Sequence, residues 1–334
     1  MISKETVIRS VFTIVIFLSI TATIGIVLLL ESKQQIFSMI NSSQNEMSVT
    51  PFPVSVNLAT RAIIENPAVE NFFDETLASA PESKNNWWNK IASIFSSHEW
   101  YQNLASPVGR IVVIWPGDRK EEAAKNIGDI LGWNKADRSE FIRLVDSTSP
   151  VIAEGKYYPG QYVAHKGATP NDMKDLIEQE FQTKILSRYT PEVEKQVPLN
   201  DALIIASLLE REASDFNNMR EVSGVIWNRL FKNMPLQLDA TLQYVRGSSQ
   251  YEAKWWPAIK PADKYIKSAY NTYKNPGLPP APIANPSAEA LLAALNPVVT
   301  DCIFYFHAKG GQYYCSPTYE EHVSKLKSIY GQGR

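Results

Sequence analysis

The feature that most constrains this chain is an uncharged stretch from Ser10 to Leu30 that is rich in Ile, Val, Leu and Phe. A helix of roughly 21 residues rises about 30 Å, which matches the hydrocarbon core of a bilayer. Lys4 and Arg9 precede the stretch, and positive charge on the near side favours a cytoplasmic N-terminus. We therefore expect a single-pass anchor in the lipid bilayer of the inner (plasma) membrane, with all later residues on the outer, periplasmic side.

The alternative is a cleaved signal peptide, whose apolar region is usually shorter and ends in small residues at the cleavage site. Here the stretch closes with Leu28-Leu29-Leu30-Glu31, which offers no such site. The pattern therefore favours a retained anchor over a removed leader.

Composition excludes some classes of partner. The chain has 334 residues, 44% of them hydrophobic and 20% charged, and its formal net charge is −2. These proportions are those of a globular protein with a core. Since no broad basic surface is implied, nucleic acid is not an expected partner.

The two cysteines, Cys302 and Cys315, flank two β-prone runs, 303–306 and 312–314, which are separated by a Gly-Gly pair. This arrangement predicts a hairpin. Outside the membrane the cysteines could form a disulfide, or they could remain two buried thiols, and the sequence leaves both open. The four histidines are scattered without zinc-ligand spacing, so we expect no metal and no cofactor.

Strands and helices alternate without a βαβ rhythm, which predicts an α+β fold. Capping patterns suggest where several helices begin. The expected elements are a strand over 111–115 and five helices. The first helix covers 118–131, the second begins at 137, and the third covers 172–186 with Asn171 as its cap. The fourth begins at Asn200 or Asp201, and the fifth covers about 219–231 with Asn218 and Glu221 as its cap pair.

The helix that follows residue 200 carries two glutamates, Glu210 and Glu212. Two residues correspond to about 200° around a helix, so the two side chains face opposite ways. Glu212 shares its face with large apolar residues (Ile205, Leu208 and Leu209), whereas Glu210 shares its face with smaller ones on average (Leu203, Ala206 and Ser207). A carboxyl held against apolar groups tends to stay protonated near neutral pH. By pattern alone, however, the solvated end of a helix is the favoured interpretation of 210–212.

Several motifs after this helix have a characteristic order. They are the run 206–212 (Ala-Ser-Leu-Leu-Glu-Arg-Glu), Asn228-Arg229-Leu230, Met234-Pro235-Leu236-Gln237 with Asp239 and Thr241, Tyr270-Asn271-Thr272-Tyr273, the Pro-rich loop 277–286, Ala294-Leu295-Asn296-Pro297, and Thr318-Tyr319-Glu320-Glu321-His322. With these motifs, residues 110–330 resemble the endolytic murein transglycosylase family (MltG/YceG-like).

The resemblance implies an enzyme of the cell wall. Members cleave the bond between N-acetylmuramic acid and N-acetylglucosamine within peptidoglycan glycan strands, and a hydroxyl of the substrate closes an anhydro ring without added water. The catalytic glutamate of the family corresponds to Glu212, which would serve as general acid and then as base. As substrate-binding residues we name those of the matching motifs: Glu210, Asn228, Gln237, Asp239, Thr241, Tyr270, Asn271, Thr272 and Tyr273. Peptidoglycan synthases of the elongation or division machinery are candidate protein partners.

The resemblance also suggests a division of the chain. We expect an anchor with a cytoplasmic tip (1–34), a tether and divergent membrane-proximal region (35–108), an accessory α+β part (109–199) and a catalytic part (200–334). Two departures stand out. No motif of the LysM-like module usual in the family is visible in 36–108, and Gly160 and Gln161 replace the acidic residue and Thr expected after 154–159.

Two other functions compete with this interpretation. A hydrolase of the same bond would use Asp239 as a second carboxylate, at about 5 Å from Glu212 for retention or roughly 6.5–9.5 Å for inversion. A non-catalytic wall-binding scaffold would need no proton donor at all. The mass of the products separates the transglycosylase from the hydrolase. Turnover on isolated strands would exclude the scaffold.

Overall fold

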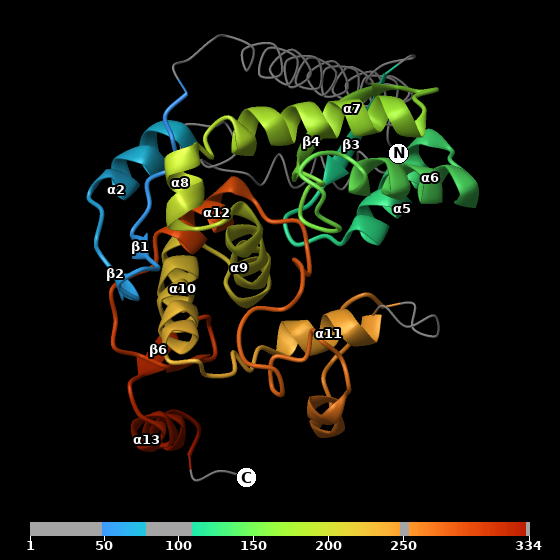
Figure 1. Cartoon of the computed structure of the whole chain (residues 1–334). Coiled ribbons are helices and arrows are strands. Elements are labelled where there is room, and N and C mark those ends of the chain that lie inside the picture. Colours follow the sequence, from blue (N-terminus) through green and yellow to red (C-terminus); the bar gives the residue numbers. More distant parts are fainter. Residues whose placement is uncertain (1–48, 78–108, 248–253, 332–334) are drawn as a thin grey trace, which may run out of the picture. The chain divides into compact units, whose positions relative to one another are not determined.

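A computed structural model describes residues 49–77, 109–247 and 254–331 (Figure 1). The predicted anchor at 10–30 and most of the predicted tether region lie outside these ranges. In the ranges described, no helix is both long and apolar enough to cross a membrane. From Thr50 onward the chain forms one compact unit.

The elements follow one another as a mixture of helices and very short sheets. In chain order they are β1 (Val56–Asn57), β2 (Ala62–Ile63), α2 (Ala68–Phe72), β3 (Gly109–Ile114), α5 (Lys120–Leu131), α6 (Lys135–Asp146), β4 (Gly160–His165), α7 (Pro170–Phe181), α8 (Pro191–Gln196), α9 (Leu199–Glu212), α10 (Phe216–Phe231), α11 (Asp239–Gly247), α12 (Ala288–Leu295), β5 (Phe304–His307), β6 (Tyr313–Ser316) and α13 (Tyr319–Tyr330).

The strands pair as antiparallel ladders, β1 with β2, β3 with β4 and β5 with β6. In the β5–β6 hairpin, Tyr305 lies opposite Cys315. Helices combined with small antiparallel sheets confirm the α+β prediction for this part of the chain. The division at residues 108 and 199 stays a prediction.

Three helices, α9, α10 and α12, pack side by side and form the main core (Figure 1). Residues 202–209 of α9 are buried on every side, as a helix at the centre of a core must be. Gly224 lets α10 approach the next segment closely, because a Cβ there would lie 2.5 Å from the Val298 carbonyl oxygen. The Trp227 indole N–H donates to the Ala294 carbonyl at 2.8 Å and joins α10 to α12.

A second hydrophobic cluster joins the β3–β4 ladder to α5, α6 and α7. Its fully buried side chains include Val112, Ile127, Phe141 and Ile177. Full burial of such a side chain stabilises the fold by roughly 1.5–3 kcal/mol. The segment before α2 and α2 itself belong to the main core instead, since Phe52 and Phe72 pack with α9 and its neighbours.

Several predicted helix starts are wrong by one turn or less. α6 begins at Lys135 with Asn134 as its cap, not at 137. The cap of α7 is Thr169, not Asn171, and its α-helical part ends at Phe181, before a π-helical turn over Gln182–Leu186.

The start of α10 shows why such errors arise. Asp215, not Asn218, accepts the first-turn N–H, and the earlier start places Phe216 in the core, stacked on Phe73. Likewise α9 begins at Leu199, ahead of Asn200 and Asp201, and its first N–H donates to Glu194 at 2.9 Å. A polar run offers several possible caps, and burial of the first apolar side chain selects among them.

Candidate active site

The two glutamates of α9 have different partners. Glu210 accepts the backbone N–H of Ser287 at 2.7 Å, next to the N-terminus of α12, where a carboxylate is favoured by the helix dipole. Burial raises the pKa of Glu210 while this bond opposes the rise. Glu210 therefore holds α12 against α9.

Glu212 is the last residue of α9, and its carboxyl meets groups from two other elements. Its Oε2 accepts the Tyr305 hydroxyl of β5 at 2.8 Å, and it also accepts the backbone N–H of Ala240 at the start of α11. Desolvation and, less strongly, the charge of Asp239 raise the pKa of Glu212, whereas the two hydrogen bonds and Arg211 lower it; the net result is a pKa of about 7. A carboxyl with this pKa exchanges its proton near neutral pH.

The opposite orientation of the two glutamates agrees with the helix geometry. Because α9 is buried on all sides, both carboxyls are desolvated. The two carboxyls differ in their partners. Glu210 accepts the backbone N–H of Ser287, whereas Glu212 faces Asp239 and two tyrosines, Tyr273 and Tyr305.

Asp239 opens α11 and is exposed. Its Oδ1 accepts the Tyr273 hydroxyl at 2.6 Å, and the Lys264 ammonium lies 4.7 Å from the centre of the Tyr273 ring. Desolvation, followed by Asp239 and Glu212, raises the pKa of Tyr273. The structure thus brings together three predicted site residues, Glu212, Asp239 and Tyr273.

Thr241 and Thr272 lie beneath these residues and are buried. Their hydroxyls lie 3.0 Å apart, and the Thr272 hydroxyl accepts the backbone N–H of Leu238 at 3.0 Å. The turn that they hold includes Gln237, an exposed residue with a positive φ of 54°. Such backbone strain often accompanies functional sites. The two threonines support the turn, and Gln237 and Asp239 lie on its outer side.

Three further predicted residues have partners inside the protein. The Asn271 amide is fully buried and donates to the carbonyls of Lys264 and Ile266. Tyr270 packs its ring 4.9 Å from Tyr244. The Asn228 amide donates to the carbonyls of residues 300 and 302, which lead into the β5–β6 hairpin.

The β5–β6 hairpin supplies the site residue that sequence reasoning missed, Tyr305. The predicted hairpin is confirmed, and Cys302 and Cys315 form a disulfide across it with their Cα atoms 5.7 Å apart. Tyr305 is 93 residues from Glu212 in sequence. An aromatic residue in a short strand is ordinary, so no local signal marked it.

Arg229 explains how distant segments converge on Glu212. It is 7% exposed and donates to the Ile303 carbonyl, just before Tyr305, and to the Leu236 carbonyl, just before Asp239, each at 2.6 Å. A guanidinium with several fixed donors suits such bridging. The Asn228-Arg229 motif therefore positions the two segments that flank Glu212.

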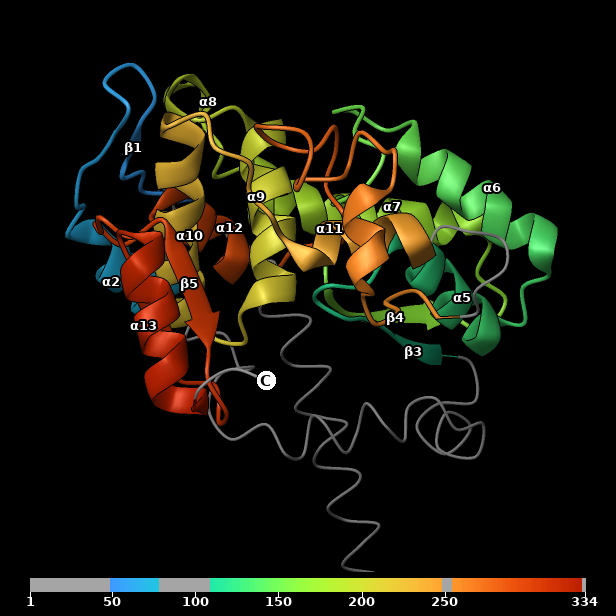
Figure 2. The same cartoon turned by 90° about the horizontal axis from the view of Figure 1, so that it is seen from below.

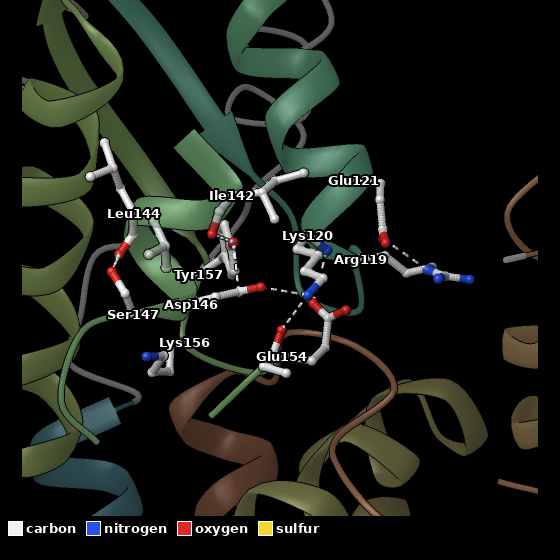
Figure 3. Close-up of polar contacts among 12 residues, drawn as sticks. Arg119, Lys120, Glu121, Ile142, Leu144, Asp146, Ser147, Glu154, Lys156 and Tyr157 are labelled. Carbon is white, nitrogen blue, oxygen red and sulfur yellow. Dashed lines mark hydrogen bonds and ion pairs between the residues drawn. The ribbon is translucent and has the colours of Figure 1, made fainter. Parts of the chain in front are cut away.

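A second polar cluster surrounds the buried Glu154 (Figure 3). Its Oε1 accepts the backbone N–H of Lys120 at 2.8 Å and so caps α5. The Lys120 ammonium donates to Asp146 at 2.7 Å, and the Tyr157 hydroxyl donates to the same carboxylate. Desolvation raises the pKa of Glu154 to about 8.

Asn285 connects the Glu154 cluster to the Pro-rich loop. Its side-chain oxygen accepts the N–H groups of Gly155 and Tyr157, and its amide donates to Glu154. These contacts give the 154–159 motif a structural role. In the portion of the chain that the structure describes, no three His, Cys, Asp or Glu side chains are grouped as metal ligands.

The fold and this site define a class: an α+β domain with a protonatable carboxyl at the end of a buried helix, flanked by tyrosines and a second carboxylate. The family model of the YceG-like family matches residues 54–328. The chain therefore belongs to the YceG-like family.

Named relatives agree with this assignment. The chain is 33% identical over 180 residues to the endolytic murein transglycosylase of Bacillus subtilis, a match over 53% of this chain and 48% of the relative. It is 28% identical over 184 residues to the protein of the same name from Streptococcus pneumoniae D39, over 55% of this chain and 33% of the relative. The matches thus span less than half of these relatives.

A solved structure is also similar. The crystal structure of a putative YceG-like protein from Listeria monocytogenes matches 64% of this chain and 75% of its own chain, with a TM-score of 0.56 and 28% identity. Together these comparisons confirm the resemblance that the motifs suggested.

Proposed function

We propose that this protein is an endolytic lytic transglycosylase that cleaves MurNAc–GlcNAc bonds in peptidoglycan strands and leaves anhydro-MurNAc ends. The observation that carries the proposal is the position of the Glu212 carboxyl, which lies at the end of α9 and accepts the Tyr305 hydroxyl at 2.8 Å. Its pKa of about 7 agrees with a group that both gives and takes a proton at neutral pH. The names of the relatives support the same reaction class.

In the proposed reaction Glu212 first protonates the glycosidic oxygen that leaves with GlcNAc, and the bond from that oxygen to the anomeric carbon of MurNAc breaks. The resulting Glu212 carboxylate then removes the proton of the MurNAc C6 hydroxyl, whose oxygen bonds to the anomeric carbon. Glu212 ends protonated again, so the cycle closes without water or cofactor.

The surroundings of Glu212 suit both halves of this cycle. Burial favours the neutral acid that the first half needs. The Ala240 N–H and the positive end of the α11 dipole stabilise the carboxylate that the second half needs. Neither state is favoured strongly enough to stop proton exchange near neutral pH.

A hydrolase that uses Asp239 is the second candidate, because the charge of Asp239 acts on Glu212. Purified glycan strands incubated with full-length protein, followed by mass spectrometry, separate the candidates. Products one water lighter than reducing-end muropeptides support the transglycosylase, and reducing ends support the hydrolase. Uncut strands that still bind the protein support a wall-binding scaffold and contradict both enzymes.

We further propose that residues 10–30 anchor the protein in the inner membrane, with the N-terminus in the cytoplasm and the Glu212 domain outside. Lys4 and Arg9 support this orientation. An outward position brings the site to the glycan strands and to the synthases that make them, which are the partners we expect.

A further inference from the structure

The Tyr305 hydroxyl donates to Glu212 Oε2 at 2.8 Å. We propose that Tyr305 is a positioning residue, which holds the Glu212 carboxyl in its reacting orientation and stabilises its ionised form. This inference rests on the proposed function, since it assigns Tyr305 a task in the reaction of Glu212.

The environment of Tyr305 suits a permanent donor. Its ring packs beside those of His307 and Tyr313, at centroid distances of 6.0 and 6.1 Å. Burial and the neighbouring Glu212 raise the pKa of Tyr305 well above its usual value. The phenol therefore keeps its proton throughout the working range of pH, and that proton is available to the Glu212 carboxylate.

The hairpin that carries Tyr305 is fixed at three points. The Arg229 guanidinium donates to the Ile303 carbonyl, and the Asn228 amide donates to the carbonyls of residues 300 and 302. Cys315, which lies opposite Tyr305 in the hairpin, forms a disulfide with Cys302. In Figure 2, β5 lies between α10 and α13, so helices flank it on both sides. A hydroxyl on such a rigid support is well placed to orient another side chain.

The charged and titratable groups around this pair are few. Glu212 faces Arg211 from its own helix, Asp239 from α11 and Tyr273 from the segment between α11 and α12, besides Tyr305. Tyr305 in turn faces Arg229 of α10, His307 of its own strand and Tyr313 of β6. Replacing Tyr305 by Phe removes a bond to the carboxylate and leaves every one of these charges in place. The pKa of Glu212 should therefore rise.

The test compares Tyr305→Phe with Tyr313→Phe in the full-length protein. Tyr313 is a matched control, because it stands on the same hairpin but donates to the Glu221 carbonyl on α10, away from Glu212. We expect Tyr305→Phe to lower kcat about tenfold at unchanged KM. The alkaline limb of the rate–pH profile should move up by on the order of one pH unit, the usual size of one bond to a charged group. Tyr313→Phe should change neither.

A readout independent of turnover keeps the inference separate from the proposed function. Infrared difference spectra against Glu212→Gln follow the Glu212 carboxylic-acid band as pH rises. If that band disappears at higher pH in Tyr305→Phe than in the wild type, the positioning role stands, even if the wild type cuts no glycan and the proposed function fails. An unmoved band, or equal shifts in both tyrosine variants, would overturn the inference.

Discussion

Replacement of Glu212 by Gln should abolish most of the activity without unfolding the protein. Gln has nearly the shape of Glu and can still accept the Tyr305 hydroxyl through its carbonyl oxygen. What it lacks is a transferable proton. A positioned acid–base group contributes about 10²–10⁴ in rate, so cleavage should fall by two to four orders of magnitude.

The pKa of Glu212 sets the pH range over which this loss is observed. With a pKa of about 7, half of the molecules carry the acidic proton at pH 7, compared with about 1 in 300 at the ordinary value of 4.5. Desolvation therefore increases the supply of acid at neutral pH by a factor on the order of 100. Wild-type kcat/KM should decline as pH rises through about 7, and Glu212→Gln should lack this dependence.

The stability of the wild type should also fall as pH rises through this range. Because the folded-state pKa of Glu212 lies above its unfolded value, its contribution is fully present below about pH 4.5 and is lost as pH rises through about 7. At about 1.4 kcal/mol per unit, the shift from 4.5 to about 7 makes the loss at most about 3.5 kcal/mol. Glu212→Gln should thus be more stable than the wild type at pH 8 and no more stable at pH 4, as measured by denaturant unfolding.

Glu210→Gln is the matched control, one half-turn away on α9. It weakens a charge-assisted bond to Ser287, so it should lower the free energy of unfolding by about 1–2 kcal/mol and reduce the rate much less than Glu212→Gln. Both variants are assayed on isolated glycan strands by product mass spectrometry. If Glu210→Gln abolished cleavage and Glu212→Gln retained it, the assignment of Glu212 would be refuted.

Three more perturbations test other parts of the argument. Asp239→Asn should lower the pKa of Glu212 and move the alkaline limb of the rate–pH profile down while anhydro products persist; complete loss of activity would favour the hydrolase instead. Double replacement of Cys302 and Cys315 by Ser should lower the free energy of unfolding by about 3 kcal/mol, as expected for a short closed loop, and reductant should do the same to the wild type only. A C-terminal reporter should be active only outside the cytoplasm, and a mature chain beginning after residue 30 would contradict the retained anchor.

The local parts of the structure were largely predictable from the sequence. The helix around 203–212, the strand at 111–114 and the hairpin at 304–316 all follow from hydrophobic patterning and turn residues. Helix starts were less predictable, as Asp215 and Thr169 show, because neighbouring polar residues compete for the cap position.

The sequence by itself also determined that Glu210 and Glu212 point apart, since helix geometry alone imposes this, and its motifs determined the family. Only the tertiary structure decided what each carboxyl does. The N-terminus of α12 meets Glu210, and Arg229 draws the segments of Tyr305 and Asp239 to Glu212. The pKa of a carboxyl depends on burial and on charges within a few ångströms, and at Glu212 those groups come from segments up to 93 residues away along the chain.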